Sequence, residues 1–375
     1  MFATLAGGYS RSPHRDQPDR LAAARIAFKQ GEIDATVLRA VEDNVVAEVV
    51  GEQDAAGLEL LTDGQLRWPD SAGTLIYGLE NVVTGGAHPL AVSGEPQWVA
   101  PVTVRDWQFL RAATELPVRH TLVGPYTLGR MIDPGPITRE RLTMTLADAM
   151  AKELRALADA GADVIQIEER AATLIASDSE RTLFRTAHRR MTHALQGVHL
   201  MLAITEGSAH RAGPLTIFDG PYRSYLFDLV AGAQNWLLIA EAPGDRGIIC
   251  GVADATSAEP DDPARIRWAA RYASLVRRRG PDRVGLAPSG SLGFLSREAA
   301  YAKAERLSTV ALDLFEATEQ GEPEAEIEAL VMEGLTHGYY GNVQGSAVEE
   351  ARRRDLPDAD PGADDGVSPG ATSDD

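Results

Sequence analysis

The sequence predicts an α/β protein folded as a single closed (β/α)8 barrel, also called a TIM barrel. Three observations support this class. The chain has 375 residues, and one such barrel takes about 250 or more. Strand-like and helix-like segments alternate along it, which is typical of a parallel sheet. Apolar residues make up 44% of the chain, which is enough for a large core.

Five segments have apolar residues at helical spacing. In residues 38–56, for example, Val41, Val45 and Val49 recur on one face, and Gly57 follows as a stop signal. We therefore predict helices at residues 38–56, 142–159, 181–196, 263–279 and 298–317.

Eight short apolar segments are predicted as strands, and most of them end in a polar or acidic residue. These segments are residues 2–6, 58–61, 120–123, 164–167, 199–204, 236–240, 248–252 and 284–287. Eight parallel strands suit a closed barrel. The alternative is an open doubly wound sheet. However, no glycine-rich dinucleotide-binding fingerprint follows any strand, and Gly7-Gly8 is too short to count as one.

The predicted barrel ends well before the last residue. We assign residues 1–318 to the barrel, 319–354 to a C-terminal arm and 355–375 to a disordered acidic tail. The tail contains seven Asp and no basic residue. Because it offers little apolar area to bury, nothing offsets the entropy that ordering it would cost.

Charge and cysteine content exclude several classes of protein. The chain carries 36 basic and 55 acidic residues, a formal net charge of −19, which disfavours binding to nucleic acid or to an anionic membrane. Its one cysteine, Cys250, rules out an intrachain disulfide and a zinc site with two thiolates from this chain. No apolar run is long enough to span a bilayer, and residues 1–18 lack the apolar stretch of a signal peptide. We expect a cytoplasmic protein that acts on a small molecule, as a monomer or as a homodimer.

Acidic residues at strand ends are the first candidates for catalysis. The carboxyl ends of the strands meet at one rim of a barrel. We therefore expect Glu168, Glu169 and Asp254 to lie there, with His210 on a long loop after its strand. Carboxyl and imidazole groups at such a rim can act as general acids or bases. The alternative for the two glutamates is a structural ion pair with a neighbouring arginine.

The strand-end segments, taken in order, resemble the catalytic barrel of cobalamin-independent methionine synthase. The resemblance covers about residues 2–315 and is carried by segments 6–11 (Ala-Gly-Gly-Tyr-Ser-Arg), 61–65 (Leu-Thr-Asp-Gly-Gln), 123–128 (Val-Gly-Pro-Tyr-Thr-Leu), 162–169 (Ala-Asp-Val-Ile-Gln-Ile-Glu-Glu), 238–241, 251–254 and 287–292. It implies a barrel in which zinc holds a thiolate that accepts a methyl group from 5-methyltetrahydrofolate.

The resemblance and the rim positions together give two sets of candidate binding residues. The candidate substrate-binding residues are Gly8, Tyr9, Arg11, Asp63, Gln65, Arg67, Glu206, Glu241 and Ser289. The candidate residues for binding the folate donor are Gly124, Pro125, Tyr126, Thr127 and Arg130. The arginines in both sets are suited to a carboxylate, such as a folate tail or an acidic substrate.

The positions at which the resemblance implies zinc ligands have changed. The family uses a His-x-Cys pair, a glutamate and a second cysteine, and the corresponding residues here are Met201, Ala203, Glu241 and Gly290. A shift of two residues would bring His199 into the first position, but it would supply no thiolate. We therefore predict no metal site.

The pocket that the resemblance implies for homocysteine has changed as well. Gly8 stands where the family has a serine, Gln65 where it has a glutamate, and Glu168 where it has an aspartate. We therefore expect an acceptor other than homocysteine, in a setting such as specialised metabolism.

The leading hypothesis is a zinc-free methyltransferase that transfers a methyl group, with 5-methyltetrahydrofolate as the donor, to a small acceptor. Two alternatives stay open at this stage. One is an acid/base lyase or decarboxylase on the same barrel. The other is a barrel without catalytic activity that binds a folate-like ligand.

Overall fold

The computed structural model describes residues 1–11, 18–83, 90–321, 323–336 and 338–339. The prediction of a disordered tail at residues 355–375, and much of the predicted arm, lie outside these residues. Among the described residues, no helix combines the length and the apolar character needed to cross a membrane.

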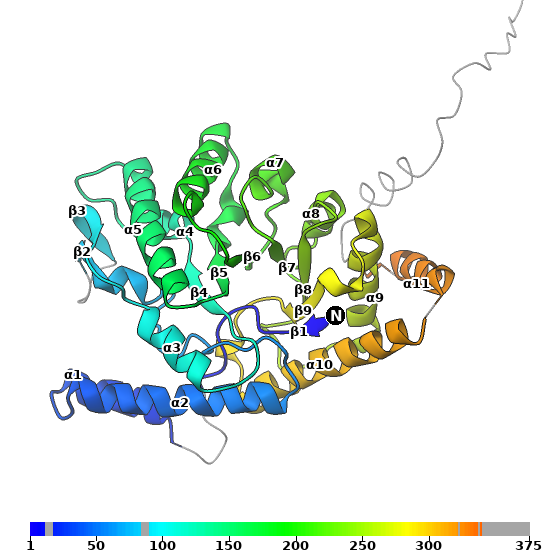
Figure 1. The fold of residues 1–375 in the computed structure, drawn as a ribbon, viewed down its shortest axis with the longest axis horizontal. Helices are drawn as coiled ribbons and strands as arrows, with labels where there is room; N and C mark the ends of the chain where they lie inside the picture. Colours follow the sequence, from blue (N-terminus) through cyan, green and yellow to red (C-terminus); the bar gives the residue numbers. More distant parts are fainter. Residues whose placement is uncertain (12–17, 84–89, 322, 337, 340–375) are drawn as a thin grey trace, which may run out of the picture.

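Seven parallel strands form one curled sheet, in the order β1-β9-β8-β7-β6-β5-β4 (Figure 1). They are β1 (Phe2–Ala3), β4 (His120–Val123), β5 (Val164–Glu168), β6 (His199–Ile204), β7 (Ser224–Asp228), β8 (Gly247–Ala253) and β9 (Val284–Pro288). All of the pairings within this sheet are parallel.

An eighth extended segment closes the sheet into a barrel. Leu60 pairs with Thr4 next to β1, and Leu61 pairs with Val118 next to β4, both in parallel. The Leu61 N–H donates to Pro117, and the Leu61 carbonyl accepts from Arg119, at 2.9 Å each. The predicted strand at residues 58–61 is therefore present as a short bridge, and the predicted closed (β/α)8 barrel is confirmed.

One predicted strand was wrong. Residues 236–240 belong to helix α8 (Asn235–Glu241), and the strand at this point of the barrel is β7 (Ser224–Asp228), a segment for which no element was predicted. All five β7 residues are buried, so the segment lacks the alternation that marks a half-buried strand. The apolar stretch 236–240 has only five residues, which is too few to distinguish the period of a strand from that of a helix.

The remaining helices lie around the strands (Figure 1). They are α1 (Arg20–Lys29), α2 (Ala35–Ala55), α3 (Val104–Ala112), α4 (Pro125–Met131), α5 (Arg139–Asp159), α6 (Asp178–Thr192), α7 (Pro214–Ile217), α9 (Pro263–Leu275), α10 (Arg297–Glu319) and α11 (Glu324–Thr336). The predicted helices at 38–56, 142–159, 181–196, 263–279 and 298–317 correspond to α2, α5, α6, α9 and α10. An antiparallel hairpin, β2 (Leu79–Val83) and β3 (Ala91–Trp98), packs against α5.

The apolar core consists of two parts. A small cluster fills the inside of the barrel and consists of Ala6, Leu60, Met201, Ala203, Leu226, Ile249 and Ala287. A larger cluster lies between the strands and the surrounding helices. Because the barrel interior is filled with side chains, ligands are expected at its ends and not through its centre.

The last described helix, α11, packs on α9. The Trp268 indole N–H of α9 donates to the Val331 carbonyl of α11 at 2.9 Å, and Val331 is buried. Gly334 allows the close approach, since a Cβ atom at this position would lie 2.1 Å from the Trp268 ring. The first part of the predicted C-terminal arm is thus a helix seated on the barrel.

Candidate active site

Glu168 is the last residue of β5 and lies at the carboxyl end of the barrel. Its Oε1 accepts hydrogen bonds from Gln65 Nε2 at 2.6 Å and from Gln166 Nε2 at 3.2 Å. Burial raises the pKa of the Glu168 carboxyl to about 7, although the hydrogen bond from Gln65 and the charge of Arg119 favour its ionised form. A carboxyl group poised near neutrality can both donate and accept a proton.

The loop after the closing segment brings Gln65 to this carboxyl. Gln65 has a positive φ of 56°, in the left-handed region that residues other than glycine rarely adopt. The Asp63 carboxylate fixes the turn by accepting the Gln65 N–H at 2.9 Å. Asp63 and Gln65 are therefore at the rim as predicted, and the strained backbone of Gln65 is typical of a functional site.

Arg119 lies inside the barrel near Glu168, and the sequence analysis did not single it out. Its side chain is fully buried, and Nη2 donates to the Leu5 carbonyl at 2.7 Å. The other two guanidinium nitrogens have no hydrogen-bond partner among the described residues. Burial lowers the pKa of Arg119 to about 10, and the charges of Glu168 and Asp63 oppose that shift. The signal available in the sequence was a basic residue directly before the predicted strand at residues 120–123.

Glu169, the neighbour of Glu168, has a structural environment. Its carboxylate accepts the N–H groups of Tyr126 at 3.0 Å and Thr127 at 2.7 Å, and the Thr127 hydroxyl at 2.6 Å. It thereby caps the first turn of α4, where backbone donors have no helical partner. His188 Nε2 lies 3.0 Å from the same carboxylate. The structure assigns Glu169 a capping role instead of the predicted catalytic one, because strand geometry turns adjacent side chains to opposite faces.

The predicted donor-binding turn forms the start of α4, next to Glu168. The Gly124 N–H donates to the Glu168 carbonyl at 2.8 Å, and Pro125 is the first residue of the helix. Gly124 is required here, since a Cβ atom would lie 2.2 Å from Glu169 Oε1. Arg130, at the far end of α4, pairs with Glu180 at 3.0 Å.

The first strand leads into a loop that closes the rim. The Gly8 carbonyl accepts the Leu292 N–H at 2.8 Å, which joins this loop to the turn after β9. A Cβ atom at Gly8 would lie 2.8 Å from Ser291 Oγ and 3.2 Å from Gln65 Oε1. Glycine at this position therefore permits close packing of three rim loops.

Three further predicted substrate-binding residues have structural contacts. Tyr9 is buried in the core. Arg11 Nη2 donates to the carbonyls of Gln65 at 3.0 Å and Trp68 at 2.8 Å, and so fixes the loop that carries Gln65. The Arg67 guanidinium is buried and pairs with Asp43 at 2.6 Å. These side chains support the rim from outside the barrel mouth.

The remaining rim candidates follow β6, β8 and β9. Asp254 accepts the N–H and hydroxyl of Thr256, and hydrogen bonds from Thr256 hold its pKa below the usual value, against the effect of burial. Ser289 Oγ accepts the Ala255 N–H at 3.1 Å. Glu206 is exposed, has a positive φ of 64° and lies 4.0 Å from Arg170. These residues lie at strand ends on the rim, as predicted.

His210 begins a single short turn in the loop after β6. Its backbone N–H donates to Ser208 Oγ at 3.2 Å. Its Nδ1 atom is buried and has no hydrogen-bond partner in the described part of the chain. The catalytic role predicted for His210 stays a prediction.

Glu241 does not lie on this rim. It is the last residue of α8, a helix that leads back to the start of β8, so it lies toward the amino ends of the strands. The carboxylate that ends the seventh strand is Asp228, which is 98% buried. It accepts the backbone N–H groups of Gly207 at 3.0 Å and of Val230 and Ala231 at 2.9 Å. Asp228 therefore occupies the position for which the sequence analysis proposed Glu241.

The side chains at the expected zinc-ligand positions do not fit a zinc ion. Met201 and Ala203 belong to the apolar cluster inside the barrel, and Gly290 has no side chain. His199 is the first residue of β6, at the opposite end of the strand from the rim, which excludes the alternative two-residue shift. Among the described residues, no three His, Cys, Asp or Glu side chains are grouped as a metal site requires.

Comparison with known proteins identifies the relatives of this barrel. Residues 16–190 match the family described as cobalamin-independent synthase, catalytic domain. This match covers a little less than half of the chain. The matched residues include Gln65, Glu168 and the turn at the start of α4, and they end before β6.

Two bacterial proteins are similar to part of this chain. The 5-methyltetrahydropteroyltriglutamate–homocysteine methyltransferase of Caulobacter vibrioides is 34% identical over 194 residues, which is 49% of this chain and 24% of the relative. The protein of the same name from Proteus mirabilis is 29% identical over 166 residues, 41% of this chain and 22% of the relative. The matches thus span about a quarter of the length of these curated relatives.

Solved structures with related names share the fold. A B12-independent methionine synthase from Shewanella has a TM-score of 0.73 at 17% identity, over 85% of this chain and 98% of that chain. A methyltransferase from Methanosarcina mazei has a TM-score of 0.54 at 14% identity, over 83% and 94% of the two chains. At these identities the likeness is one of fold.

Proposed function

We propose that this chain is an enzyme that transfers a methyl group from 5-methyltetrahydrofolate to a small acceptor other than homocysteine, without zinc, and that Glu168 is its general acid/base. The observation that carries the proposal is the Glu168 carboxyl at the carboxyl end of β5, with a pKa near 7 and hydrogen bonds from Gln65 and Gln166. Active sites of this barrel class form at that end.

The donor is proposed from the family and from the position of the match. The two bacterial relatives are named for transfer from a 5-methyltetrahydropteroyl compound. The matched residues 16–190 contain Glu168 and the turn at the start of α4. This supports a donor site of the same chemical class in the first half of the barrel.

The change of acceptor is proposed from the second half of the barrel. There the expected ligand positions are Met201, Ala203 and Gly290, and Asp228 is bound by three backbone N–H groups. None of these side chains offers a thiolate or imidazole to a metal ion. A thiol acceptor would lose the activation that a metal supplies, so an acceptor that is itself a good nucleophile, or that gives its proton to a base, is favoured.

The proposed step is a direct displacement. The nucleophilic atom of the acceptor forms a bond to the methyl carbon, and the bond from that carbon to N5 of the pterin breaks with its electron pair on N5. Protonated Glu168 donates its proton to N5, and the carboxylate that remains takes the proton released by the acceptor. Gln65 and Gln166 hold the carboxyl in place during both transfers.

Calorimetric titration of the full chain with 5-methyltetrahydrofolate tests the proposal. We expect saturable binding to the wild type that weakens as pH rises through about 7, because the protonated Glu168 carboxyl is the form that donates to the pterin. Glu168→Gln should bind the donor with no pH dependence in this range, since the amide stays a donor. Glu32→Gln, at an exposed position before α2, is the matched control and should behave like the wild type.

Two results would count against the proposal. Absence of binding would exclude the folate donor and favour the acid/base lyase or decarboxylase. Binding whose pH dependence is the same in Glu168→Gln as in the wild type would remove Glu168 from the mechanism.

A further inference from the structure

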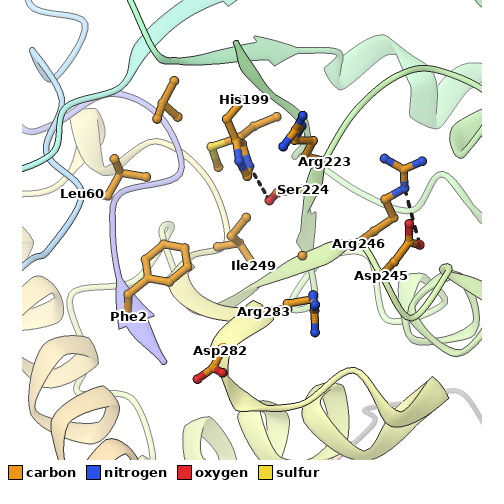
Figure 2. A pocket seen from close by; sticks show the side chains of 13 residues that line it. Phe2, Leu60, His199, Arg223, Ser224, Asp245, Arg246, Ile249, Asp282 and Arg283 are labelled. Atoms are coloured by element: carbon orange, nitrogen blue, oxygen red, sulfur yellow. Dashed lines mark hydrogen bonds and ion pairs between the residues drawn. The ribbon is translucent and has the colours of Figure 1, made fainter. Parts of the chain in front are cut away.

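Figure 2 shows a pocket of about 500 Å³. It lies at the amino ends of the strands, the end of the barrel opposite Glu168. His199, Ser224 and Gly247, which line it, are the first residues of β6, β7 and β8. Val164, which also lines it, is the first residue of β5, and Glu168 is the last. The two residues are four positions apart along the strand, which is about 13 Å, so a molecule in this pocket cannot also occupy the proposed active site.

The floor of the pocket is apolar. It is formed by the lower layer of the barrel interior, with Phe2, Leu60 and Ile249 among its side chains (Figure 2). Gly285 keeps this floor compact, since a Cβ atom there would lie 2.7 Å from the Phe2 ring and 3.0 Å from Ile249. An aromatic ring or short aliphatic body could cover these side chains and exclude water from them.

The wall of the pocket is basic, although the chain as a whole is acidic. Arg223, Arg246 and Arg283 line it together with Asp245 and Asp282, a formal charge of +1 from three basic and two acidic residues. Asp245 lies 3.7 Å from Arg246, so this arginine is partly neutralised. The net charge of the chain is −19, so this positive wall contrasts with the molecule as a whole and favours an anionic ligand.

With Asp245 beside Arg246, the net charge of +1 comes from Arg223 and Arg283 against the one remaining carboxylate of the wall, Asp282. Arg223 and Arg283 are both exposed, and within the described part of the chain neither lies within ion-pair distance of a carboxylate. Arg283 uses one nitrogen to donate to the Arg279 carbonyl at 3.1 Å, which leaves the rest of its guanidinium available. Ser224 Oγ lies 2.7 Å from His199 Nε2 and adds polar groups beside Arg223.

We infer that this pocket is a second ligand site, which binds a small amphiphilic anion with its apolar body on the Phe2 and Ile249 floor and its carboxylate, sulfonate or phosphate between Arg223 and Arg283. The volume lies within the range of small-molecule pockets, about 300–1,000 Å³. The combination of an apolar floor and a few convergent charged groups is typical of such sites. This site is separate from the proposed methyl-transfer site and does not depend on it.

Fluorescence titration of the full chain with 8-anilinonaphthalene-1-sulfonate, an aromatic anion, tests the inference. We expect saturable binding to the wild type. Arg223→Glu and Arg283→Glu should each weaken binding by about tenfold or more, because each removes a charge-assisted contact and adds repulsion. Arg39→Glu, at an exposed position near the start of α2, is the matched control and should bind like the wild type.

The neutral probe N-phenyl-1-naphthylamine separates the two parts of the site. Its binding should be weaker than that of the anion and should not change in Arg223→Glu or Arg283→Glu. The inference is overturned if the anion binds equally to all variants, or if the two probes respond alike. Glu168→Gln should leave binding of the anion unchanged. A failure of the second ligand site can therefore be distinguished from a failure of the proposed methyl transfer.

Discussion

Two adjacent glutamates at the end of β5 have opposite roles because their side chains point to different faces of the strand. Glu168 reaches the barrel mouth, where burial raises its pKa to about 7. Glu169 reaches the surrounding helices, where it accepts three hydrogen bonds from Tyr126 and Thr127. The sequence predicted both as catalytic, because near a strand end either face could have turned inward.

The different roles of the two glutamates can be tested through the free energy of unfolding. Glu169→Gln should lower the free energy of unfolding by about 2–4 kcal/mol, since it removes the charge that holds the first turn of α4 and leaves buried donors poorly paired. Urea unfolding monitored by circular dichroism measures the change.

Glu168→Gln is the matched variant for this experiment. It should change the free energy of unfolding at pH 7 by less than about 1 kcal/mol, because Gln has the same shape as a carboxyl that is already about half protonated at its pKa of about 7. Equal losses in the two variants would contradict the separation of roles.

At the scale of elements, the segment from β6 to α8 shows where sequence reasoning failed. Asn235, the first residue of α8, donates to the carbonyls of Gly207 at 2.9 Å and Asp228 at 2.8 Å, and its Oδ1 accepts the Ala209 N–H at 2.9 Å. A single buried amide thus joins the loop after β6, the end of β7 and the start of α8. The sequence alone does not show that these three elements meet.

We predict that Asn235→Ala lowers the free energy of unfolding by about 2–3 kcal/mol, because it leaves the partners of a fully buried amide unpaired. Glu241→Ala, at the other end of the same helix, should be neutral both for stability and for binding of the folate donor. Thermal and urea unfolding of both variants test this. A stable Asn235→Ala variant, or loss of donor binding in Glu241→Ala, would contradict the description of α8.

At the scale of the whole molecule, the two halves of the barrel differ in whether they match the model of the cobalamin-independent synthase family. The matched residues 16–190 cover the half that carries Glu168 and the capped turn of α4. In the other half, the interior position Met201 and the turn at Gly290 lack metal-binding groups. The barrel keeps its shape through this change because small and apolar side chains fill its interior.

Metal content tests this difference. We predict that the purified full chain contains well below one zinc equivalent by mass spectrometry, and that chelator treatment does not alter binding of 5-methyltetrahydrofolate. The reason is that Met201, Ala203 and Gly290 stand at the expected ligand positions, which therefore supply neither a thiolate nor an imidazole to a zinc ion. One tightly held equivalent of zinc, or loss of donor binding after chelation, would contradict it.

The sequence by itself determined the fold class, the position of seven of the eight barrel strands and the acidic rim. Strand and helix periodicity are local properties, and a polar residue at a strand end can be recognised without knowing its neighbours in space. For the same reason the sequence located Glu168 and the residues around Gly124 that lie beside it. It also predicted that Met201, Ala203 and Gly290 could not bind zinc.

Only the tertiary structure decided which carboxylates face the barrel mouth and which support the fold. Glu169 and Asp228 became structural through backbone donors from distant elements, and Glu241 moved to the other end of the barrel with α8. Arg119 and the basic pocket around Arg223 depend on residues far apart in the chain. Such contacts follow from the closure of the barrel, which brings strand ends together that no local pattern connects.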